Sequence, residues 1–375
     1  MARFDFAAID FNRSPFLVIW EVTRACALAC VHCRADAIAR RDPRELTTEE
    51  GFLLIDQVRA FGARPPLLVL TGGDPMRRPD LAELVGYGRA AGLTVALTPS
   101  GTAAATPARL AELKKVGLSR IAVSLDGPDA ESHDAFRGVR GSYGWTLRII
   151  DAAIDLGLPL QINSTISKRT LPHFDAMAAR VSALPVTLWA LFFLIQTGRG
   201  TSLEPISSDE CERLLNRLYD LSLTAPFGIK TTEAPHYQRV VWQREAARLN
   251  ANLPTQAVHR RRQLRAPRNV GDGNGFVFVN HLGNIFPSGF LPMQRGNVNT
   301  ASLVDIYRND LVFTALRNPD ALGGKCGRCR FRGVCGGSRS RAFAATGDAM
   351  ASDTLCGYEP GAVIEPLVSN LEEQP

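Results

Sequence analysis

Short apolar runs alternate with helical segments from residue 16 to about residue 195, and this alternation constrains the fold more than any other feature. Six runs have the length and composition of buried strands: FLVIWEV (16–22), LLVL (67–70), LTVALT (93–98), RIAVSL (120–125), LPLQIN (158–163) and VTLWALFFLI (186–195). Several stretches between them repeat apolar residues every three or four positions, as amphipathic helices do. Six strand-helix units predict an α/β fold with a parallel sheet, either open or closed into a barrel.

Glycine, proline and polar residues follow three of these runs, in TGGDP (71–75), TPSG (98–101) and LDGP (125–128). The carboxyl ends of parallel strands meet at one edge of a sheet, and in parallel α/β folds that edge carries the active site. We therefore expect functional residues in these three segments.

The pattern divides the chain into four segments. Residues 1–13 are expected to form an N-terminal tail, and residues 14–200 a core domain. Residues 201–270 lack strong periodicity and are predicted to be a helical connector. Residues 271–375 are expected to form a second domain, with a hairpin around HLGN, a helix at about 301–317 and a tail rich in glycine and cysteine.

Composition and charge narrow the class of protein. The formal charge of +6 comes from scattered arginines, and the one run of three, at 260–262, has no interleaved aromatic residues, so we expect no nucleic-acid partner. The N-terminus does not resemble a secretory signal, and no segment approaches the roughly 20 apolar residues of a membrane span. We expect a cytoplasmic protein without a membrane partner, in which clustered cysteines are more often metal ligands than disulfides.

Three of the eight cysteines, Cys26, Cys30 and Cys33, lie in CALACVHC, immediately after the first predicted strand. A structural zinc ion normally has four ligands, and His32 lies between two of the cysteines, so it cannot easily turn toward the same metal. A cubane iron-sulfur cluster fits better, because three thiolates can bind three irons and leave the fourth open. The motif therefore predicts a [4Fe-4S] cluster with one accessible iron.

This C-x-x-x-C-x-x-C motif after the first strand, with GGDP after the second, resembles the radical S-adenosylmethionine (SAM) enzymes. The resemblance implies a partial (β/α)6 TIM-like barrel in which Cys26, Cys30 and Cys33 bind the catalytic cluster that chelates SAM and cleaves it reductively. The product would be a 5′-deoxyadenosyl radical that abstracts hydrogen from the substrate. A donor of the flavodoxin or ferredoxin type would supply the electron.

The resemblance also implies which residues bind the cofactor. Gly72, Gly73 and Asp74 match a GGE segment that meets the methionine ammonium group, with aspartate in place of glutamate. The other cofactor-binding candidates lie in VSLDG, in HDAFRG and in the cysteine motif: Ser124, Asp126, Arg137 and His32. An arginine suits the SAM carboxylate because this pairing makes charge-assisted hydrogen bonds.

Four more cysteines lie near the C-terminus: Cys326, Cys329, Cys335 and Cys356. Their spacing alone is compatible with zinc or with a second cluster. The segment resembles the SPASM and twitch extensions of radical SAM enzymes, which implies an auxiliary [4Fe-4S] cluster. Full SPASM domains bind two, but Ser288 and Ser338 stand where further cysteines would be needed, so we expect one. The eighth cysteine, Cys211, lies in a helical pattern and is expected to be structural.

The most extensive resemblance, over nearly the whole chain, is to the haem-biosynthesis branch of this superfamily, whose enzymes alter propionate or acetate side chains of an iron tetrapyrrole. It is carried by RSPFLVIWEVTRACALACVHC, QTGRG, GNIFPSGFLPMQRGNV and the cysteine-rich tail. Such a substrate needs cations for its carboxylates and apolar surface for its ring. The candidates for these contacts are Arg199, Arg339, Arg341, Phe192, Phe193 and Phe290.

Two alternatives remain open from the sequence. Maturation of a ribosomally made precursor peptide is a common task of SPASM relatives, although no leader-binding domain is apparent before residue 14. A non-catalytic iron-sulfur or zinc protein, such as an electron carrier, is a different class of function. The open iron of the three-cysteine site favours an enzyme, because a carrier gains nothing from it.

Overall fold

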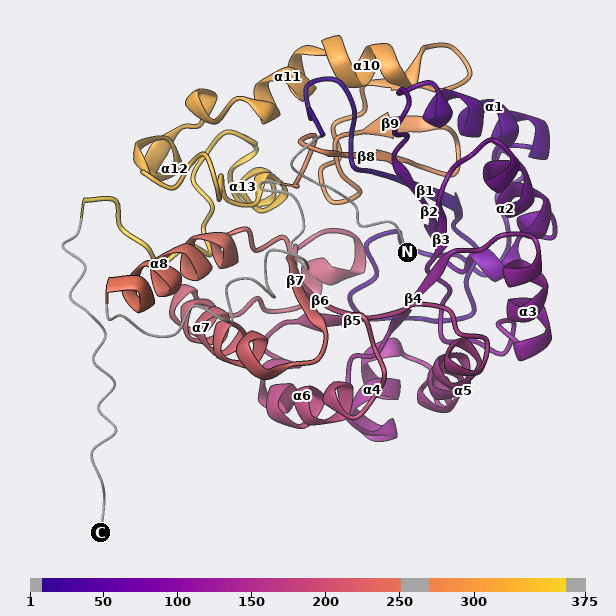
Figure 1. Cartoon of the computed structure of the whole chain (residues 1–375), viewed down its shortest axis with the longest axis horizontal. Helices are drawn as coiled ribbons and strands as arrows, with labels where there is room; N and C mark the ends of the chain where they lie inside the picture. Colours follow the sequence, from indigo (N-terminus) through magenta and orange to yellow (C-terminus); the bar gives the residue numbers. More distant parts are fainter. Residues whose placement is uncertain (1–8, 251–269, 362–375) are drawn as a thin grey trace.

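The computed structural model of the protein describes residues 9–250 and 270–361. A single ten-stranded sheet runs through both parts, in the order β10-β9-β8-β1-β2-β3-β4-β5-β6-β7 (Figure 1). Its strands are β1 (Leu17–Thr23), β2 (Leu67–Gly72), β3 (Val95–Leu97), β4 (Arg120–Ser124), β5 (Leu160–Ile166), β6 (Leu188–Phe193), β7 (Gly228–Thr232), β8 (Phe276–Val279), β9 (Asn284–Phe286) and β10 (Gly296–Asn297). Strands β1 to β8 pair in parallel, and β9 and β10 pair antiparallel.

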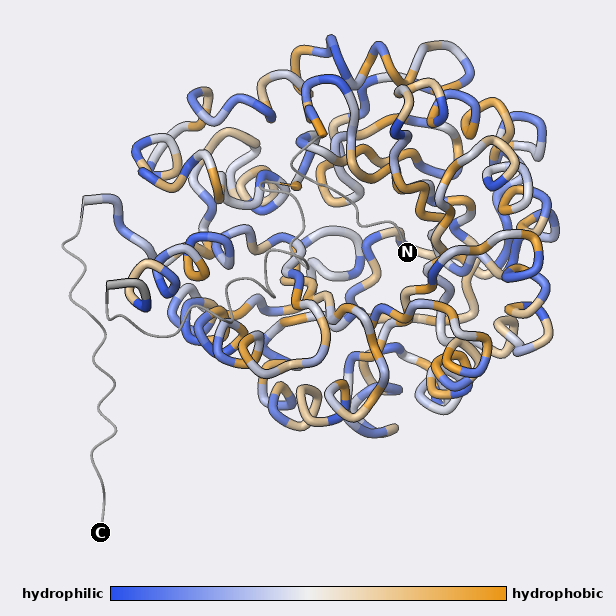
Figure 2. Tube along the Cα trace, in the orientation of Figure 1, coloured by the Kyte–Doolittle hydropathy of each residue, from blue (hydrophilic) through white to orange (hydrophobic). Residues whose placement is uncertain are grey.

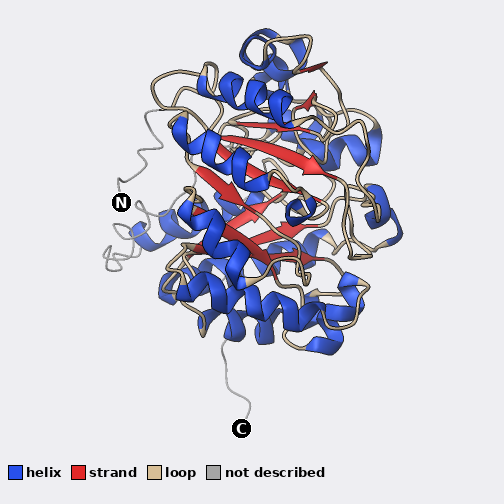
Figure 3. Cartoon of the chain, turned by 90° about the vertical axis from the view of Figure 1, so that its right-hand side faces the viewer, coloured by secondary structure: helices blue, strands red, loops and turns tan. Residues whose placement is uncertain are grey.

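Helices surround the sheet, as the view turned by 90° shows (Figure 3). The first group follows the core strands: α1 (Thr48–Arg59), α2 (Leu81–Ala90), α3 (Pro107–Lys115), α4 (Ala130–Arg137), α5 (Ser142–Asp155) and α6 (Phe174–Ser182). The second group is α7 (Ser208–Thr224), α8 (His236–Asn250), α10 (Leu303–Asn309), α11 (Leu311–Arg317), α12 (Gly324–Arg328) and α13 (Arg339–Thr346). Among the described residues, no helix combines the length and apolarity needed to cross a membrane.

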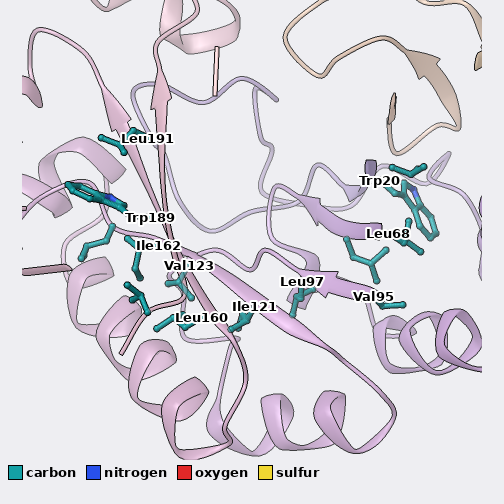
Figure 4. Packing of buried hydrophobic residues seen from close by; sticks show 14 of the residues in the cluster. Trp20, Leu68, Val95, Leu97, Ile121, Val123, Leu160, Ile162, Trp189 and Leu191 are labelled. Atoms are coloured by element: carbon teal, nitrogen blue, oxygen red, sulfur yellow. The ribbon is translucent and has the colours of Figure 1, made fainter. Parts of the chain in front are cut away.

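The two faces of the sheet differ in packing. Every second strand residue belongs to the main hydrophobic cluster, which fills the space between sheet and helices (Figure 4): Val18, Trp20, Leu68, Leu70, Val95, Leu97, Ile121, Val123, Leu160, Ile162, Trp189 and Leu191. The strands accordingly appear mostly hydrophobic (Figure 2). The alternate residues point to the inner face, and there Val69, Ser124, Asn163, Thr165 and Phe192 are only partly buried.

The predicted α/β fold with six core strands is confirmed, and each strand lies within its predicted run or within three residues of it. The sheet remains open, as a partial barrel. Two strands were missed. The short β10 pairs with β9 beyond the predicted hairpin, and β7 lies in the segment predicted to be only helical and adds to β6 in parallel. Its sequence, GIKTT, carries one apolar side chain in five residues, too few for a recognisable period.

The C-terminal segment also joins the same sheet. The predicted hairpin forms β8 and β9, and β8 pairs in parallel with β1. The predicted helix at 301–317 is instead two helices, because Asp310 ends α10 and its carboxylate caps α11 by accepting from the N–H groups of Val312 and Phe313. The described end of the N-terminal tail contacts this region, since Tyr307 donates to the Phe11 carbonyl at 2.7 Å.

Candidate active site

The three-cysteine loop begins directly after β1. Cys26 and Cys30 are buried and Cys33 is partly buried. The backbone N–H of Leu28 lies 3.3 Å from Cys26 Sγ, and that of Ala37 lies 3.5 Å from Cys33 Sγ. Hydrogen bonds to sulfur tune a bound cluster, so the donor set fits the predicted [4Fe-4S] group.

Two glycines at the end of β2, Gly72 and Gly73, let the end of this strand lie close to the three-cysteine loop. Gly72 has a φ of +144°, and a Cβ atom on Gly73 would lie 2.5 Å from the carbonyl oxygen of Arg24 and 2.6 Å from that of Ala25. The N–H of Gly73 donates to the Thr23 carbonyl at 2.8 Å. Only glycine permits such an approach. These contacts hold the cysteine loop, and the methionine-binding role of the two glycines stays a prediction.

Asp74 also serves the structure of this edge. Its buried carboxylate accepts from the Thr102 hydroxyl at 2.7 Å, and burial raises the pKa of the Asp74 carboxyl. Ser100, in the next strand-end loop, donates to the Gly73 carbonyl at 2.5 Å and lies 3.6 Å from Cys26 Sγ. The Asp74 carboxylate thus has an internal partner, and its predicted contact with the cofactor stays a prediction.

Arg137 and Asp126 meet beside the cluster cysteines. A nitrogen of the Arg137 guanidinium lies 3.8 Å from Cys30 Sγ, and the same guanidinium forms an ion pair with the Asp126 carboxylate. Burial would raise the pKa of Asp126, but the Arg137 charge holds it below its usual range. Asp126 also accepts from the Thr165 N–H at 2.6 Å. The structure thus brings two predicted cofactor residues together, with a cation against a cysteine sulfur.

The other two predicted cofactor residues are His32, in the three-cysteine loop, and Ser124, at the end of β4. The His32 ring stacks on Phe136, with centroids 4.3 Å apart, and burial lowers the pKa of His32 to about 3, so the ring is neutral at pH 7. Its buried Nδ1 has no hydrogen-bond partner in the described residues. Ser124 ends β4 on the inner face, opposite Asn163 of β5. Their contacts to a cofactor stay predictions.

Arg199 lies against the cysteine loop rather than at a distance from it. Its backbone N–H donates to the Cys33 carbonyl at 3.0 Å, and its guanidinium donates to the carbonyls of Cys30 at 2.9 Å and Ala37 at 3.2 Å. The preceding Gly198 is equally close, because a Cβ atom there would lie 2.5 Å from the Cys33 oxygen. QTGRG therefore braces the cysteine loop, a role that sequence reasoning missed.

A buried ionic group ties the same loop to the C-terminal hairpin. Glu21, an acidic residue within the apolar β1, contacts Arg34 at 2.6 Å and His281 at 3.0 Å. Burial would raise the pKa of Glu21, but Arg34 holds it below its usual range. Arg34 also donates to the Gly289 carbonyl at 3.1 Å and lies over the Phe278 ring. A charge inside a buried strand was the signal that could have identified this group.

The four C-terminal cysteines line one small cavity, together with His236, Arg239 and Tyr358. Cys326 is buried, and its sulfur receives the Asp353 N–H at 3.4 Å and the Arg339 guanidinium at 3.7 Å. The Phe331 N–H lies 3.4 Å from Cys329 Sγ. Among the described residues, no three Cys, His, Asp or Glu are placed to hold a single metal ion, either here or at the three-cysteine loop.

Arg339 and Arg341 are buried and bonded within the chain. Arg339 donates to the carbonyls of Ala349 at 2.9 Å and Ala351 at 2.8 Å. Arg341 donates to the Glu233 carbonyl at 2.7 Å and lies 3.4 Å from the Asp353 carboxylate. Like Arg199, these predicted substrate cations have internal partners, so the contacts that the structure gives them are structural.

The other residues singled out in the sequence differ in burial and in their contacts. Phe193 belongs to the main core, whereas Phe192 and Phe290 are partly buried. Ser288 and Ser338 are buried and do not line the four-cysteine cavity; Ser338 caps α13 and Ser288 accepts from the Phe290 N–H at 3.2 Å. Cys211 is buried in α7, as expected of a structural thiol. The arginines at 260–262 lie outside the described residues.

Comparison with known proteins agrees with this geometry. Residues 20–178 match the radical SAM superfamily model. An AdoMet-dependent heme synthase of Methanosarcina barkeri is 38% identical over 353 residues, which cover 94% of this chain and 99% of that protein. A protein of the same name from Nitratidesulfovibrio vulgaris is 39% identical over 350 residues, 92% of each chain.

The fold has solved counterparts. The structure of Streptococcus suis SuiB bound to S-adenosylmethionine superposes with a TM-score of 0.69 at 15% identity, over 92% of this chain and 78% of that one. Radical SAM proteins bind a [4Fe-4S] cluster and SAM, and their enzymes cleave SAM reductively to a 5′-deoxyadenosyl radical. The chain is therefore a radical SAM enzyme and belongs to the family that includes these two heme synthases.

Proposed function

We propose that this protein is a cytoplasmic enzyme that modifies a carboxylate side chain of an iron tetrapyrrole, with one auxiliary [4Fe-4S] cluster. The observation that carries the proposal is the identity of 38% to a protein named AdoMet-dependent heme synthase over almost the full length of both chains. That likeness extends through the barrel and both cysteine segments. A likeness limited to the barrel would support the radical chemistry but no substrate.

In this proposal Cys26, Cys30 and Cys33 hold the SAM-cleaving cluster, and the bound cluster and SAM together supply the radical. The chain contributes position and charge. Arg137 lies against Cys30 Sγ, and its ion pair with Asp126 fixes the guanidinium beside the cluster site. We assign the SAM carboxylate to Arg137, the methionine ammonium to the Gly72–Asp74 segment, and the nucleoside side to Ser124, Asp126 and His32.

Cys326, Cys329, Cys335 and Cys356 would hold the auxiliary cluster. Its role would be to accept the electron that a substrate radical loses when it becomes a closed-shell product. The enclosure of all four thiols in one cavity and the Arg339 guanidinium at Cys326 support a site for an anionic cluster. A zinc ion at the same cysteines would provide structure but could not accept an electron.

The arginines predicted to bind the substrate are better assigned to positioning. Arg199 holds the three-cysteine loop, while Arg339 and Arg341 hold the four-cysteine segment and the end of β7. The half-buried Phe192 lies on the inner face of the sheet and remains a candidate for contact with the ring. We propose that a flavodoxin or ferredoxin supplies the electron for SAM cleavage.

Turnover assays under anaerobic conditions test the proposal. Protein reconstituted with iron and sulfide is given SAM, reduced flavodoxin and either an iron porphyrin with free propionates or candidate precursor peptides. We expect the porphyrin to shift its Soret band on binding and to stimulate release of 5′-deoxyadenosine above the background. Stimulation by a peptide, with no response to porphyrins, would instead establish peptide maturation.

A further inference from the structure

Two side chains of β7 face the inner side of the sheet. In the parallel pair of β6 and β7, Ala190 lies opposite Lys230 and Phe192 lies opposite Thr232. The flanking residue Ile229 packs against the outer hydrophobic cluster, so Lys230 and Thr232 point the other way. They therefore share the inner face with Phe192, the aromatic candidate for a substrate ring.

Neither side chain has a hydrogen-bond partner among residues 9–250 and 270–361. The Thr232 hydroxyl is buried and makes no hydrogen bond in the described part of the protein. Lys230 forms no ion pair or side-chain hydrogen bond to any described residue, and the residue as a whole is partly buried. A half-buried ammonium group and a buried hydroxyl without partners both lower stability, so a ligand that supplies acceptors would relieve both.

One acid, Glu233, acts electrostatically on Lys230 but makes its hydrogen bond elsewhere. Glu233 follows β7 with a φ of +59°, and its carboxyl group faces the Ser338 hydroxyl. Burial and the nearby Asp272 raise the pKa of the Glu233 carboxyl well above its usual range. Burial lowers the pKa of Lys230, and the Glu233 carboxyl offsets only part of that effect.

Lys230 differs from the three predicted substrate arginines in its internal hydrogen bonds. Arg199, Arg339 and Arg341 each donate to at least one backbone carbonyl of the chain. Lys230, by contrast, lies on the inner face opposite Ala190 and donates to no acceptor among the described residues. A carboxylate accepts from an ammonium and a hydroxyl at once, and this pairing is strong where water is scarce.

We propose that Lys230 and Thr232 form a subsite for one carboxylate of the substrate on the inner face of β7, with Phe192 beside it as the apolar contact for the ring. The inference rests on the proposed function, because it assigns the chain's own residues to the acidic side chains of that substrate. In this proposal Lys230 binds the substrate carboxylate in place of Arg199, Arg339 and Arg341.

Binding of matched porphyrins to the reconstituted holoenzyme tests the subsite. The probes are an iron porphyrin with four propionates and its tetramethyl ester, titrated by the Soret shift. Wild-type protein should prefer the acid, and Lys230→Met should weaken binding of the acid by roughly ten- to a hundred-fold while leaving the ester unaffected. Lys230→Arg should restore most of the preference, and Thr232→Val should give a smaller loss.

Two controls keep the result interpretable. Lys115→Met removes an exposed cation from α3 and should bind the acid as the wild type does. Iron content and unfolding midpoint report folding, and Lys230→Met should match or exceed wild-type stability because the removed charge had no partner. Equal affinity of Lys230→Met and wild type for the acid would overturn the subsite while leaving the proposed function intact. Failure of wild type to bind either porphyrin would overturn the proposed function, and the subsite with it.

Discussion

The two cysteine sites share a local design but differ in what surrounds them. Each places backbone N–H groups at sulfur and one guanidinium about as far from a buried thiol: Arg137 lies 3.8 Å from Cys30 and Arg339 lies 3.7 Å from Cys326. Arg137 faces a buried carboxylate, whereas Arg339 is tied to backbone carbonyls. In the proposed assignment, three cysteines leave one iron of the first cluster open beside charged groups, whereas four cysteines would leave none open at the second. On that assignment the first site is suited to bind a ligand and the second to enclose its cluster.

The largest difference between the sites should appear when the cysteines of each are replaced by alanine. Replacing Cys26, Cys30 and Cys33 by alanine should abolish SAM cleavage and reduce iron from about eight to about four per chain. Replacing the four C-terminal cysteines should leave about four irons and retain uncoupled SAM cleavage. Iron analysis and 5′-deoxyadenosine release measure both. About one zinc per wild-type chain, with half the expected iron, would contradict a second cluster.

The two arginines should differ in effect by a smaller but clear margin. Arg137→Ala leaves the buried Asp126 unpaired and should lower the free energy of unfolding by about 3–5 kcal/mol, and it should weaken SAM binding by about 1.5–3 kcal/mol. Arg339→Ala should cost about 1–3 kcal/mol of stability, because two carbonyls lose their donor, without affecting SAM. Denaturant unfolding and anaerobic equilibrium dialysis separate these effects. Equal loss of SAM affinity in both variants would show that the Arg137 assignment is wrong.

The first site should also be the more sensitive to moderate acid. Burial lowers the pKa of His133 to about 4, and its Nδ1 accepts the Asp126 N–H at 3.2 Å, so the folded protein requires the neutral ring. The unfolded chain takes up the proton near pH 6.5, so stability falls as the pH drops from there toward 4, and His133 accounts for about 2 kcal/mol of the loss at pH 5. The buried His32, with its pKa lowered to about 3, adds a similar loss of about 2 kcal/mol.

Urea unfolding at pH 7 and pH 5 measures this slope, and His133→Gln should reduce it. At the second site, Arg341 and His236 hold the pKa of Asp353 well below its usual range despite burial, so this carboxylate loses its stabilising effect only below about pH 4 and adds no slope between pH 5 and 7. An unchanged slope in His133→Gln would remove His133 as its source.

The smallest effect is expected for the cysteine that belongs to neither site. Cys211 is buried in the main core, where Cys211→Ala removes only packing and should cost about 1 kcal/mol of stability. Iron content and SAM cleavage should match the wild type, which makes this variant the matched control for the cysteine replacements above. A loss of iron in Cys211→Ala would show that the two sites do not account for all ligands.

The sequence was informative where chemistry or period imposes a local pattern. The cluster requires closely spaced thiols, so CALACVHC identified the first site, and buried strands read as apolar runs. Strand β7 was not predicted from the sequence because its inner residues, Lys230 and Thr232, are polar. Its five residues therefore carry almost no apolar period.

Contacts between distant segments could not be predicted in the same way. Arg199 reaches the Cys30 carbonyl across 169 positions, and nothing near it in the sequence identifies that partner. The same holds for Arg34 and Gly289, which are 255 positions apart. The resemblance directed attention to the correct segments, but only the structure showed that Arg199, Arg339 and Arg341 have internal partners.

The electron paramagnetic resonance spectrum of the reduced protein, recorded with and without SAM, tests the central claim most directly. If one cluster has an open iron and the other is fully ligated, SAM should change the signal of one cluster and leave the other as it was. The change should disappear in the Cys26, Cys30 and Cys33 variant and persist when the four C-terminal cysteines are replaced. A spectrum in which SAM alters both clusters, or neither, would contradict the division of the molecule into one reactive and one contained site.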